Sequence, residues 1–115
     1  MSAMPISSFE VERVINEYPG VFESAVVGVP AELTEDEIKA VVVAQEGQHV
    51  DPVELTRFLV DRLPYFMVPR YLEFAAELPK TPTQKVHKHL LRDRGVGPGV
   101  WDREAAGIVL RRAAQ

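Results

Sequence analysis

Two apolar runs in the first half of the chain place the strongest constraint on its fold. They are Ala25-Val26-Val27 and Ala40–Ala44, and they lie within segments rich in β-branched residues at Val21–Val29 and Ile38–Gln45. Such segments favour β-strands. An unbroken apolar run indicates a strand that is covered on both faces, or on one face with a neighbouring strand beside it. We therefore expect two strands with other elements packed against them.

Helical signals precede and follow these strands. Ser7 and Glu10 have the spacing of a capping box, and apolar residues follow at the spacing of one helical face. A second box at Asp51 and Glu54, with Pro52 in the first turn, predicts another helix. The apolar faces of the two predicted helices comprise Val11, Val14, Ile15 and Tyr18, and Leu55, Phe58, Leu59 and Leu63.

The rest of the chain predicts one more strand and two more helices. The strand covers Tyr71–Phe74, and a helix is expected from Val86 to Arg94 with Leu90 and Leu91 turned inward. Residues 95–115 are expected to form a flexible glycine-rich joint at 95–99, followed by an amphipathic helix over residues 101–114. The predicted fold class is α+β, a small central sheet of about three strands flanked by helices.

The composition argues against several classes of function. A chain of 115 residues can bury one hydrophobic core. Its net charge of −4 argues against a nucleic-acid partner, because phosphate binding needs a basic surface. No apolar run approaches the ~20 residues of a membrane span, and the N-terminus lacks the pattern of a secretory signal. The absence of cysteine fits a reducing compartment, so we expect a cytoplasmic protein.

One loop carries the residue on which the functional prediction depends. Within Leu78-Pro79-Lys80-Thr81-Pro82-Thr83-Gln84-Lys85-Val86, prolines and threonines oppose regular structure, and Lys85 stands where a helix is expected to begin. The helix dipole does not favour a cation there, which supports a functional role. A solvated surface lysine is the alternative. A compact charge on a long stem suits contact with a phosphate or a carboxylate.

Five motifs in order resemble the C-terminal domain of the superfamily of acyl- and aryl-CoA synthetases, adenylation domains and luciferases. The loop around Lys85 resembles the last signature of that family, in which the lysine is catalytic. The similarity extends from residue 6 to residue 92. The sequence that begins at residue 6, Ile-Ser-Ser-Phe-Glu, most resembles carnitine- or crotonobetaine-type and fatty acyl-CoA ligases. The other motifs are Ile6–Glu12, Tyr18–Val21 with Ala25–Pro30, Lys39–Val43 and Val68-Pro69.

The resemblance implies a reaction in two halves. A carboxylate attacks the α-phosphate of ATP, bound with Mg²⁺, to give an acyl-adenylate and pyrophosphate; a thiol, usually of coenzyme A, then displaces AMP. Lys85 would bridge the two anions in the first half, and the domain would then rotate as a lid to serve the second.

The resemblance also suggests residues along the path of coenzyme A. These are Ser7, Ser8, Gly28, Lys88 and Arg92. Because Lys85, Lys88 and Arg92 fall at helical spacing, they form a basic stripe if the helix includes all three. A solvated helix face is the alternative for that stripe. No protein metal site is expected from the pattern.

The chain departs from the family in two ways. Gln84 stands where the family usually has glycine, so this position must either keep a negative φ or accept strain. The large N-terminal domain of the family, with its phosphate loop and its adenine and acyl pockets, has no counterpart in the sequence. Residues 1–5 are interpreted as a leader or hinge remnant and residues 6–94 as the domain itself. The chain resembles an excised fragment, inactive alone, that needs the missing domain as its partner and binds no cofactor tightly.

Two other functions stay open beside the ligase. One is a non-catalytic interaction module on the same fold, with Gln84 as a sign of drift. The other is a small protein that binds a nucleotide or coenzyme A alone. An adenylating domain encoded upstream would favour the ligase, and titration with coenzyme A and acyl-adenylate analogues would separate the other two. The sequence does not identify the carboxylic acid that is activated, because the acyl pocket would belong to the other domain.

Overall fold

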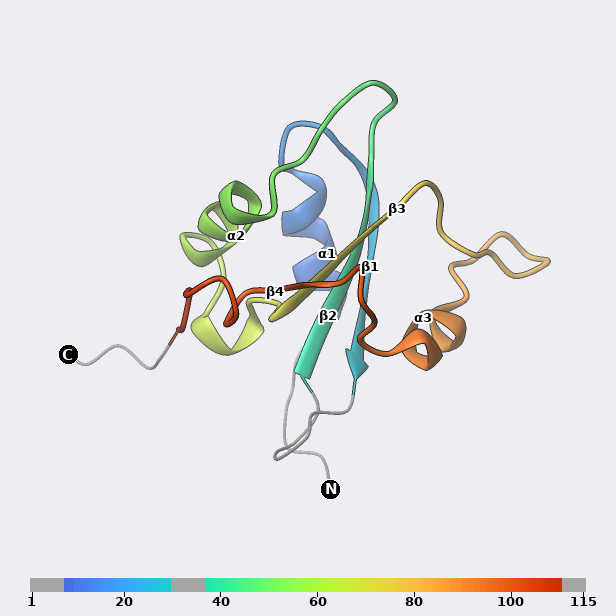
Figure 1. Ribbon diagram of the computed structural model, residues 1–115. Coiled ribbons are helices and arrows are strands. Elements are labelled where there is room, and N and C mark those ends of the chain that lie inside the picture. The colour runs from blue at the N-terminus through green and yellow to red at the C-terminus, as the bar shows by residue number, and fades with distance from the viewer. Residues whose placement is uncertain (1–7, 30–36, 111–115) are drawn as a thin grey trace.

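The computed structural model describes residues 8–29 and 37–110. Within these residues the chain forms a mixed sheet flanked by helices, which confirms the predicted α+β class (Figure 1). The strands lie side by side in chain order: β1 (Val21–Val29), β2 (Glu37–Ala44), β3 (Tyr71–Ala75) and β4 (Trp101–Asp102). The β1–β2 and β3–β4 pairs are antiparallel, and the β2–β3 pair is parallel.

The helices are arranged on both faces of this sheet. They are α1 (Ser8–Asn16), α2 (Pro52–Val60) and α3 (Lys88–Arg94), with a 3₁₀ turn η1 (Tyr65–Met67) after α2. α2 begins where the sequence predicts, because the Asp51 Oδ1 accepts the N–H of Val53 at 2.8 Å and of Glu54 at 3.3 Å. α1 and α2 lie on one face and α3 lies on the other (Figure 1).

β1 and β2 are covered on both faces, as their apolar runs predict. Val26 pairs with Ala40, and Ala25 pairs with Val41. Because successive side chains point to opposite faces, the first pair packs under α1 and α2 and the second pair packs on the side of α3. An uninterrupted run of small and β-branched side chains therefore serves two separate cores, one on each face of the sheet, where the chain length had predicted a single core.

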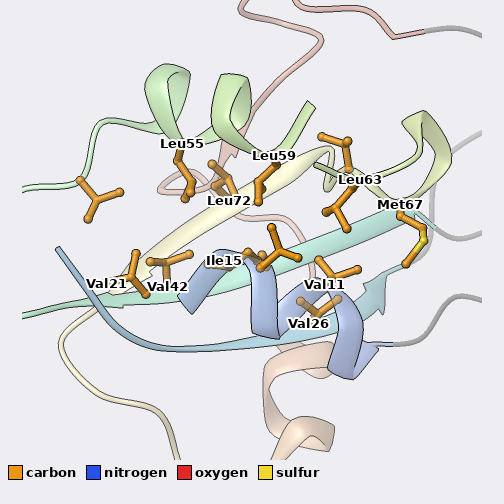
Figure 2. Packing of buried hydrophobic residues seen from close by; sticks show 14 residues of the cluster. Val11, Ile15, Val21, Val26, Val42, Leu55, Leu59, Leu63, Met67 and Leu72 are labelled. Atoms are coloured by element: carbon orange, nitrogen blue, oxygen red, sulfur yellow. The ribbon is translucent and has the colours of Figure 1, made fainter. Parts of the chain in front are cut away.

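The larger core lies between the sheet and the α1–α2 layer (Figure 2). Ile15 of α1, Leu55 and Leu59 of α2 and Leu72 of β3 are all fully buried there. A fully buried Leu or Ile side chain contributes about 1.5–3 kcal/mol through removal of its apolar surface from water. The apolar stripes predicted for the two helices therefore contribute much of the stability of this face.

The smaller core lies under α3 and the segment that precedes it. Leu91 of α3 is fully buried and packs with Val27, Val41 and Leu78. The prediction that Leu90 also turns inward was wrong, since its side chain is 44% exposed. A helix as short as α3 lies against the sheet along one stripe, and the neighbouring position points away from it.

The C-terminal segment differs from its prediction. Residues 101–110 hold the short strand β4 and a series of turns at 103–107, with no helix in this described part of the expected 101–114 helix. Arg70 binds Asp102 through two hydrogen bonds, Nε to Oδ1 at 3.0 Å and Nη2 to Oδ2 at 3.1 Å. The buried Arg103 donates to the carbonyls of Pro69 at 3.3 Å and Ile108 at 2.9 Å. These long-range bonds hold the segment as a fourth strand in place of a helix.

Candidate functional site

The candidate site lies on a small hairpin between β3 and α3 that extends away from the sheet (Figure 1). Lys80 and Val86 form an antiparallel bridge across it. The Thr81 N–H donates to the Lys85 carbonyl at 2.7 Å, and the Gln84 N–H donates to the Thr81 carbonyl at 2.8 Å. Lys85 is therefore the first residue after a three-residue hairpin tip.

The structure corrects the expected start of the following helix. α3 begins at Lys88, because Val86 belongs to the hairpin bridge and the His87 N–H donates to the Pro79 carbonyl at 2.8 Å. The backbone before Lys88 is thus already engaged in the hairpin. Lys85 does not stand at a helix terminus, so the expectation based on the helix dipole does not apply to it.

Gln84 has a left-handed backbone, with φ 68°. Of the two possibilities that the sequence left open, a negative φ or strain, the structure has the strained one. A left-handed residue at the last position is a regular feature of three-residue hairpin loops. Glycine takes this conformation freely, whereas another residue loses about 1–2 kcal/mol. Gln84 therefore keeps the turn geometry that a glycine would provide and carries a conformational cost.

The Lys85 side chain differs from those of the other lysines. It is exposed, and its ammonium has no ion pair or hydrogen bond with any residue that the structure describes. The other three each lie near a carboxylate: Lys39 is 2.6 Å from Glu73, Lys80 is 3.5 Å from Glu23 and Lys88 is 2.6 Å from Glu12. Lys85 is thus the lysine whose charge is available to an external anion.

Two of the residues suggested for coenzyme A, Ser8 and Lys88, lie together where α1 meets α3. The Lys88 Nζ donates to the Ser8 Oγ at 3.1 Å and lies 2.6 Å from the Glu12 Oε2. The same Glu12 oxygen accepts the Val26 N–H at 2.8 Å, on the edge strand β1. The ammonium also lies 5.6 Å from the centre of the Phe9 ring, which is 79% exposed. This contact set joins both helices to the strand edge.

The remaining suggested residues are dispersed. Gly28 lies near the end of β1 and pairs with Ile38 of β2. Arg92 is exposed on α3, one turn after Lys88. Ser7 lies outside the described residues. Since Lys85 is on the hairpin and not on α3, the basic stripe predicted along one helix does not form as a single row.

A buried ion pair anchors α3. The sequence analysis did not predict it. Lys39 of β2 is fully buried and lies 2.6 Å from the Glu73 Oε1 of β3, and the other Glu73 oxygen accepts from Arg94 at 2.8 Å. Burial tends to raise the pKa of the Glu73 carboxyl, but the hydrogen bonds and charges of Lys39 and Arg94 outweigh burial and hold that pKa below its usual range. The available signal was a lone charge in each of two apolar strands, Ile38-Lys39-Ala40 and Leu72-Glu73-Phe74.

Other features of the surface offer little chemistry. An open pocket beside α3 is lined in part by Glu73, Phe74 and Arg94, but its two charged side chains are paired with each other. In the described part of the chain, no three His, Cys, Asp or Glu side chains gather as a metal site would require. Across residues 8–29 and 37–110, no helix has the length and apolar character needed to cross a membrane.

Residues 10–85 match the family model described as the AMP-binding enzyme C-terminal domain. The fatty acid–[acyl-carrier-protein] ligase ScoC of Streptomyces coeruleorubidus is 41% identical over 85 residues, which are 74% of this chain and 16% of that protein. The peroxisomal trans-cinnamate:CoA ligase of Petunia hybrida is 37% identical over 97 residues, 84% of this chain and 17% of that protein. The crystal structure of ATP-bound MatB from Rhodopseudomonas palustris is similar with a TM-score of 0.74 and 34% identity, over 77% of this chain and 18% of that chain. The chain thus spans less than a fifth of each of these proteins.

Proposed function

Because the chain belongs to the family of AMP-binding enzyme C-terminal domains, we propose that it is the mobile lid of an ATP-dependent, AMP-forming acyl-CoA ligase and supplies Lys85 to adenylate formation. The observation that carries this proposal is the contrast among the lysines. Three of them lie near carboxylates, whereas Lys85 is exposed at the end of a hairpin tip and its ammonium has no partner among the described residues.

The chemistry of the first half-reaction suits such a cation. The attacking carboxylate and the α-phosphate of ATP are both anions, and pyrophosphate leaves as the acyl-adenylate forms. An ammonium placed between them holds them in line and stabilises the charge of the transition state. Loss of one such preorganised contact costs roughly 10²–10³ in rate. We propose that Mg²⁺ accompanies ATP on the larger adenylating domain, which this domain needs as its partner.

In the second half-reaction the domain would rotate, withdraw Lys85 and present another face to the thiol. We propose that Ser8, Gly28, Lys88 and Arg92 line that face, together with Ser7, which lies outside the described residues. Lys88 would then exchange part of its contact with Glu12 for a phosphate of coenzyme A. The name of ScoC makes a carrier-protein thiol the acceptor in that relative, and either thiol suits the same chemistry here. The cysteine-free sequence supports the cytoplasm as the compartment.

The test replaces the matching segment of a relative's ligase with residues 8–110 of this chain and follows each half-reaction separately. Lys85→Ala should lower ATP–pyrophosphate exchange by roughly 10²–10³-fold and leave thiolysis of preformed acyl-adenylate nearly unchanged. Lys80→Ala, on the same hairpin but paired with Glu23, is the matched control and should retain exchange. Equal loss in both half-reactions of the Lys85 variant would reject the assignment.

The chain alone provides a second test. The proposal assigns the ATP and acyl sites to the larger domain, so the 115-residue chain by itself should show no ATP–pyrophosphate exchange. Measurable exchange by the purified chain would overturn this division of labour between the two domains.

A further inference from the structure

Thr81 binds the backbone of Lys85 through two different groups. Its N–H donates to the Lys85 carbonyl at 2.7 Å, and its hydroxyl oxygen accepts the Lys85 N–H at 3.2 Å. A single residue across the hairpin therefore satisfies both backbone polar groups of the lysine. Since Lys85 is exposed, these two hydrogen bonds and not side-chain packing determine where its Cα lies.

The Thr81 hydroxyl is itself held in place. It lies 3.1 Å from the hydroxyl of Thr83, within hydrogen-bond distance. A hydroxyl has one proton and two lone pairs, so it can accept the Lys85 N–H and still bond to Thr83. Threonine is β-branched, which limits the rotation of this side chain. The acceptor offered to Lys85 is thus more rigid than a freely rotating hydroxyl.

The turn at the neighbouring residue brings the Lys85 N–H to this acceptor. Gln84 is left-handed with φ 68°, and the Lys85 N–H follows directly after it. The Gln84 N–H already bonds to the Thr81 carbonyl at 2.8 Å, so that carbonyl closes the turn. The hydroxyl of Thr81 then accepts a hydrogen bond from the next donor along the chain, the Lys85 N–H. Together these bonds set the direction in which the chain leaves the turn at Lys85.

We propose that Thr81 is a positioning residue for adenylate formation, whose hydroxyl fixes the backbone of Lys85 so that the ammonium reaches the reacting anions in one geometry. This inference rests on the function proposed above for Lys85. The lysine side chain is long, so a small rotation at its Cα moves the ammonium over a large distance. A displacement of ~1 Å at a reacting centre can cost roughly 100-fold in rate.

The experiment uses the chimeric ligase described above with Thr81→Val and Thr81→Ser. Thr81→Val keeps the shape of the side chain and removes the acceptor, so ATP–pyrophosphate exchange should fall by roughly 10- to 100-fold, with thiolysis of preformed acyl-adenylate retained. Thr81→Ser restores the oxygen and should recover most of the exchange. Thr83→Val is the graded comparison: it removes the hydroxyl that holds the acceptor but keeps the acceptor itself, so it should lower exchange less than Thr81→Val does.

A second measurement uses the 115-residue chain and does not depend on activity. Hydrogen exchange of the Lys85 amide, followed by NMR, should become faster in Thr81→Val, because its N–H loses its acceptor. It should stay slow in Thr81→Ser, and Thr83→Val should accelerate it less than Thr81→Val does. This readout separates a local change at Lys85 from general loss of the fold, which would accelerate exchange throughout the sheet.

The outcomes distinguish this inference from the function on which it rests. If Lys85→Ala leaves adenylate formation intact, the proposed function fails, and the positioning role fails with it. If Lys85→Ala abolishes exchange and Thr81→Val does not lower it, only the positioning role is overturned. Loss in both half-reactions of Thr81→Val, or no recovery in Thr81→Ser, also overturns it.

Discussion

The Lys39 ammonium lies 2.6 Å from the Glu73 carboxylate on the sheet face that α3 covers. The parallel register places Val41 beside Glu73, so Lys39 and Glu73 are diagonal neighbours on one face of β2 and β3. The same ammonium donates to the carbonyls of Gly95 at 2.8 Å and Leu91 at 3.3 Å. This ion pair therefore holds the C-terminal end of α3 against the sheet.

Lys39→Met should destabilise the protein by about 3 kcal/mol, because a buried pair loses one partner and Glu73 keeps only Arg94. Chemical unfolding monitored by circular dichroism measures this change. The exposed Arg13, which pairs with Glu10 and Glu17 on α1, provides a comparison. Arg13→Ala should alter the free energy of unfolding by less than about 1 kcal/mol, since exposed ion pairs contribute little.

A double variant separates the ion pair from simple loss of volume. Lys39→Met combined with Glu73→Leu removes both buried charges, and replacing a buried pair with apolar residues is often close to neutral. The double variant should therefore regain most of the stability lost in Lys39→Met. If the double variant loses as much stability as the single variants Lys39→Met and Glu73→Leu lose in total, the ion pair is not the cause of the loss.

Acid should weaken the attachment of β4. The hydrogen bonds from Arg70 are the main cause that holds the pKa of the Asp102 carboxyl below its usual value of 3.8. A carboxyl with a depressed folded-state pKa stabilises the protein above its unfolded-state pKa, and this contribution disappears as the pH falls through the folded-state pKa. Glu73 has a lowered pKa and acts in the same direction. Between about pH 5 and about pH 2.5, the free energy of unfolding should decrease as the pH falls.

Asp102→Asn is the variant that tests this pH dependence. It should reduce stability near neutral pH and make the decline in acid less steep than in the parent chain, because one of the carboxyls responsible has been removed. Arg70 also lies 3.6 Å from Glu37 and 3.5 Å from Glu104, and the substitution leaves these two partners in place, so the fold should survive. An unchanged acid profile would show that Asp102 contributes nothing to it.

Gln84→Gly should stabilise the hairpin. It relieves about 1–2 kcal/mol of left-handed strain, whereas the greater freedom of glycine in the unfolded chain costs about 0.5–1 kcal/mol. Gln84→Val should act in the opposite direction, since a β-branched residue tolerates a positive φ least. Urea unfolding of the two variants measures both effects. A glycine variant less stable than the parent chain would show that Gln84 makes contacts that outweigh its strain.

Lys88→Met should lower stability by about 1–2 kcal/mol, because it leaves the partly buried Glu12 carboxylate with one donor fewer. Glu12→Gln should also destabilise, since it removes the same ion pair from the other side. If Lys88 also contacts coenzyme A, the KM for coenzyme A in the chimeric ligase should rise in Lys88→Met and not in Glu12→Gln. Equal KM values in both variants would limit Lys88 to its structural role.

The sequence predicted the elements that depend on a pattern within one helical turn or one strand. The bounds of β1 agree with the predicted segment, and the cap at Asp51 and the stripe through Leu55 and Leu59 are confirmed. These features depend on periodicity and on capping chemistry within one turn or strand. The same patterns predicted the α+β class, because apolar runs covered on both faces require helices on either side of the sheet.

Long-range partners determined the features that the sequence did not reveal. The segment after residue 100 has the spacing of a helix, but Asp102 is bound by Arg70, 32 positions earlier. Lys39 and Glu73 become neighbours only through the parallel pairing of β2 and β3. Lys85 was identified correctly as exposed on a loop, but its placement on a hairpin depends on the bridge between Lys80 and Val86.

The bridge between Lys80 and Val86 makes the length of the intervening segment as important as its composition. In paired strands, a shift by one residue reverses the face to which every following side chain points. One residue inserted or deleted between these two positions would shift the pairing by one residue, and Lys85 would then point toward the opposite side of the hairpin. A change in the length of this hairpin therefore redirects the charge that it carries.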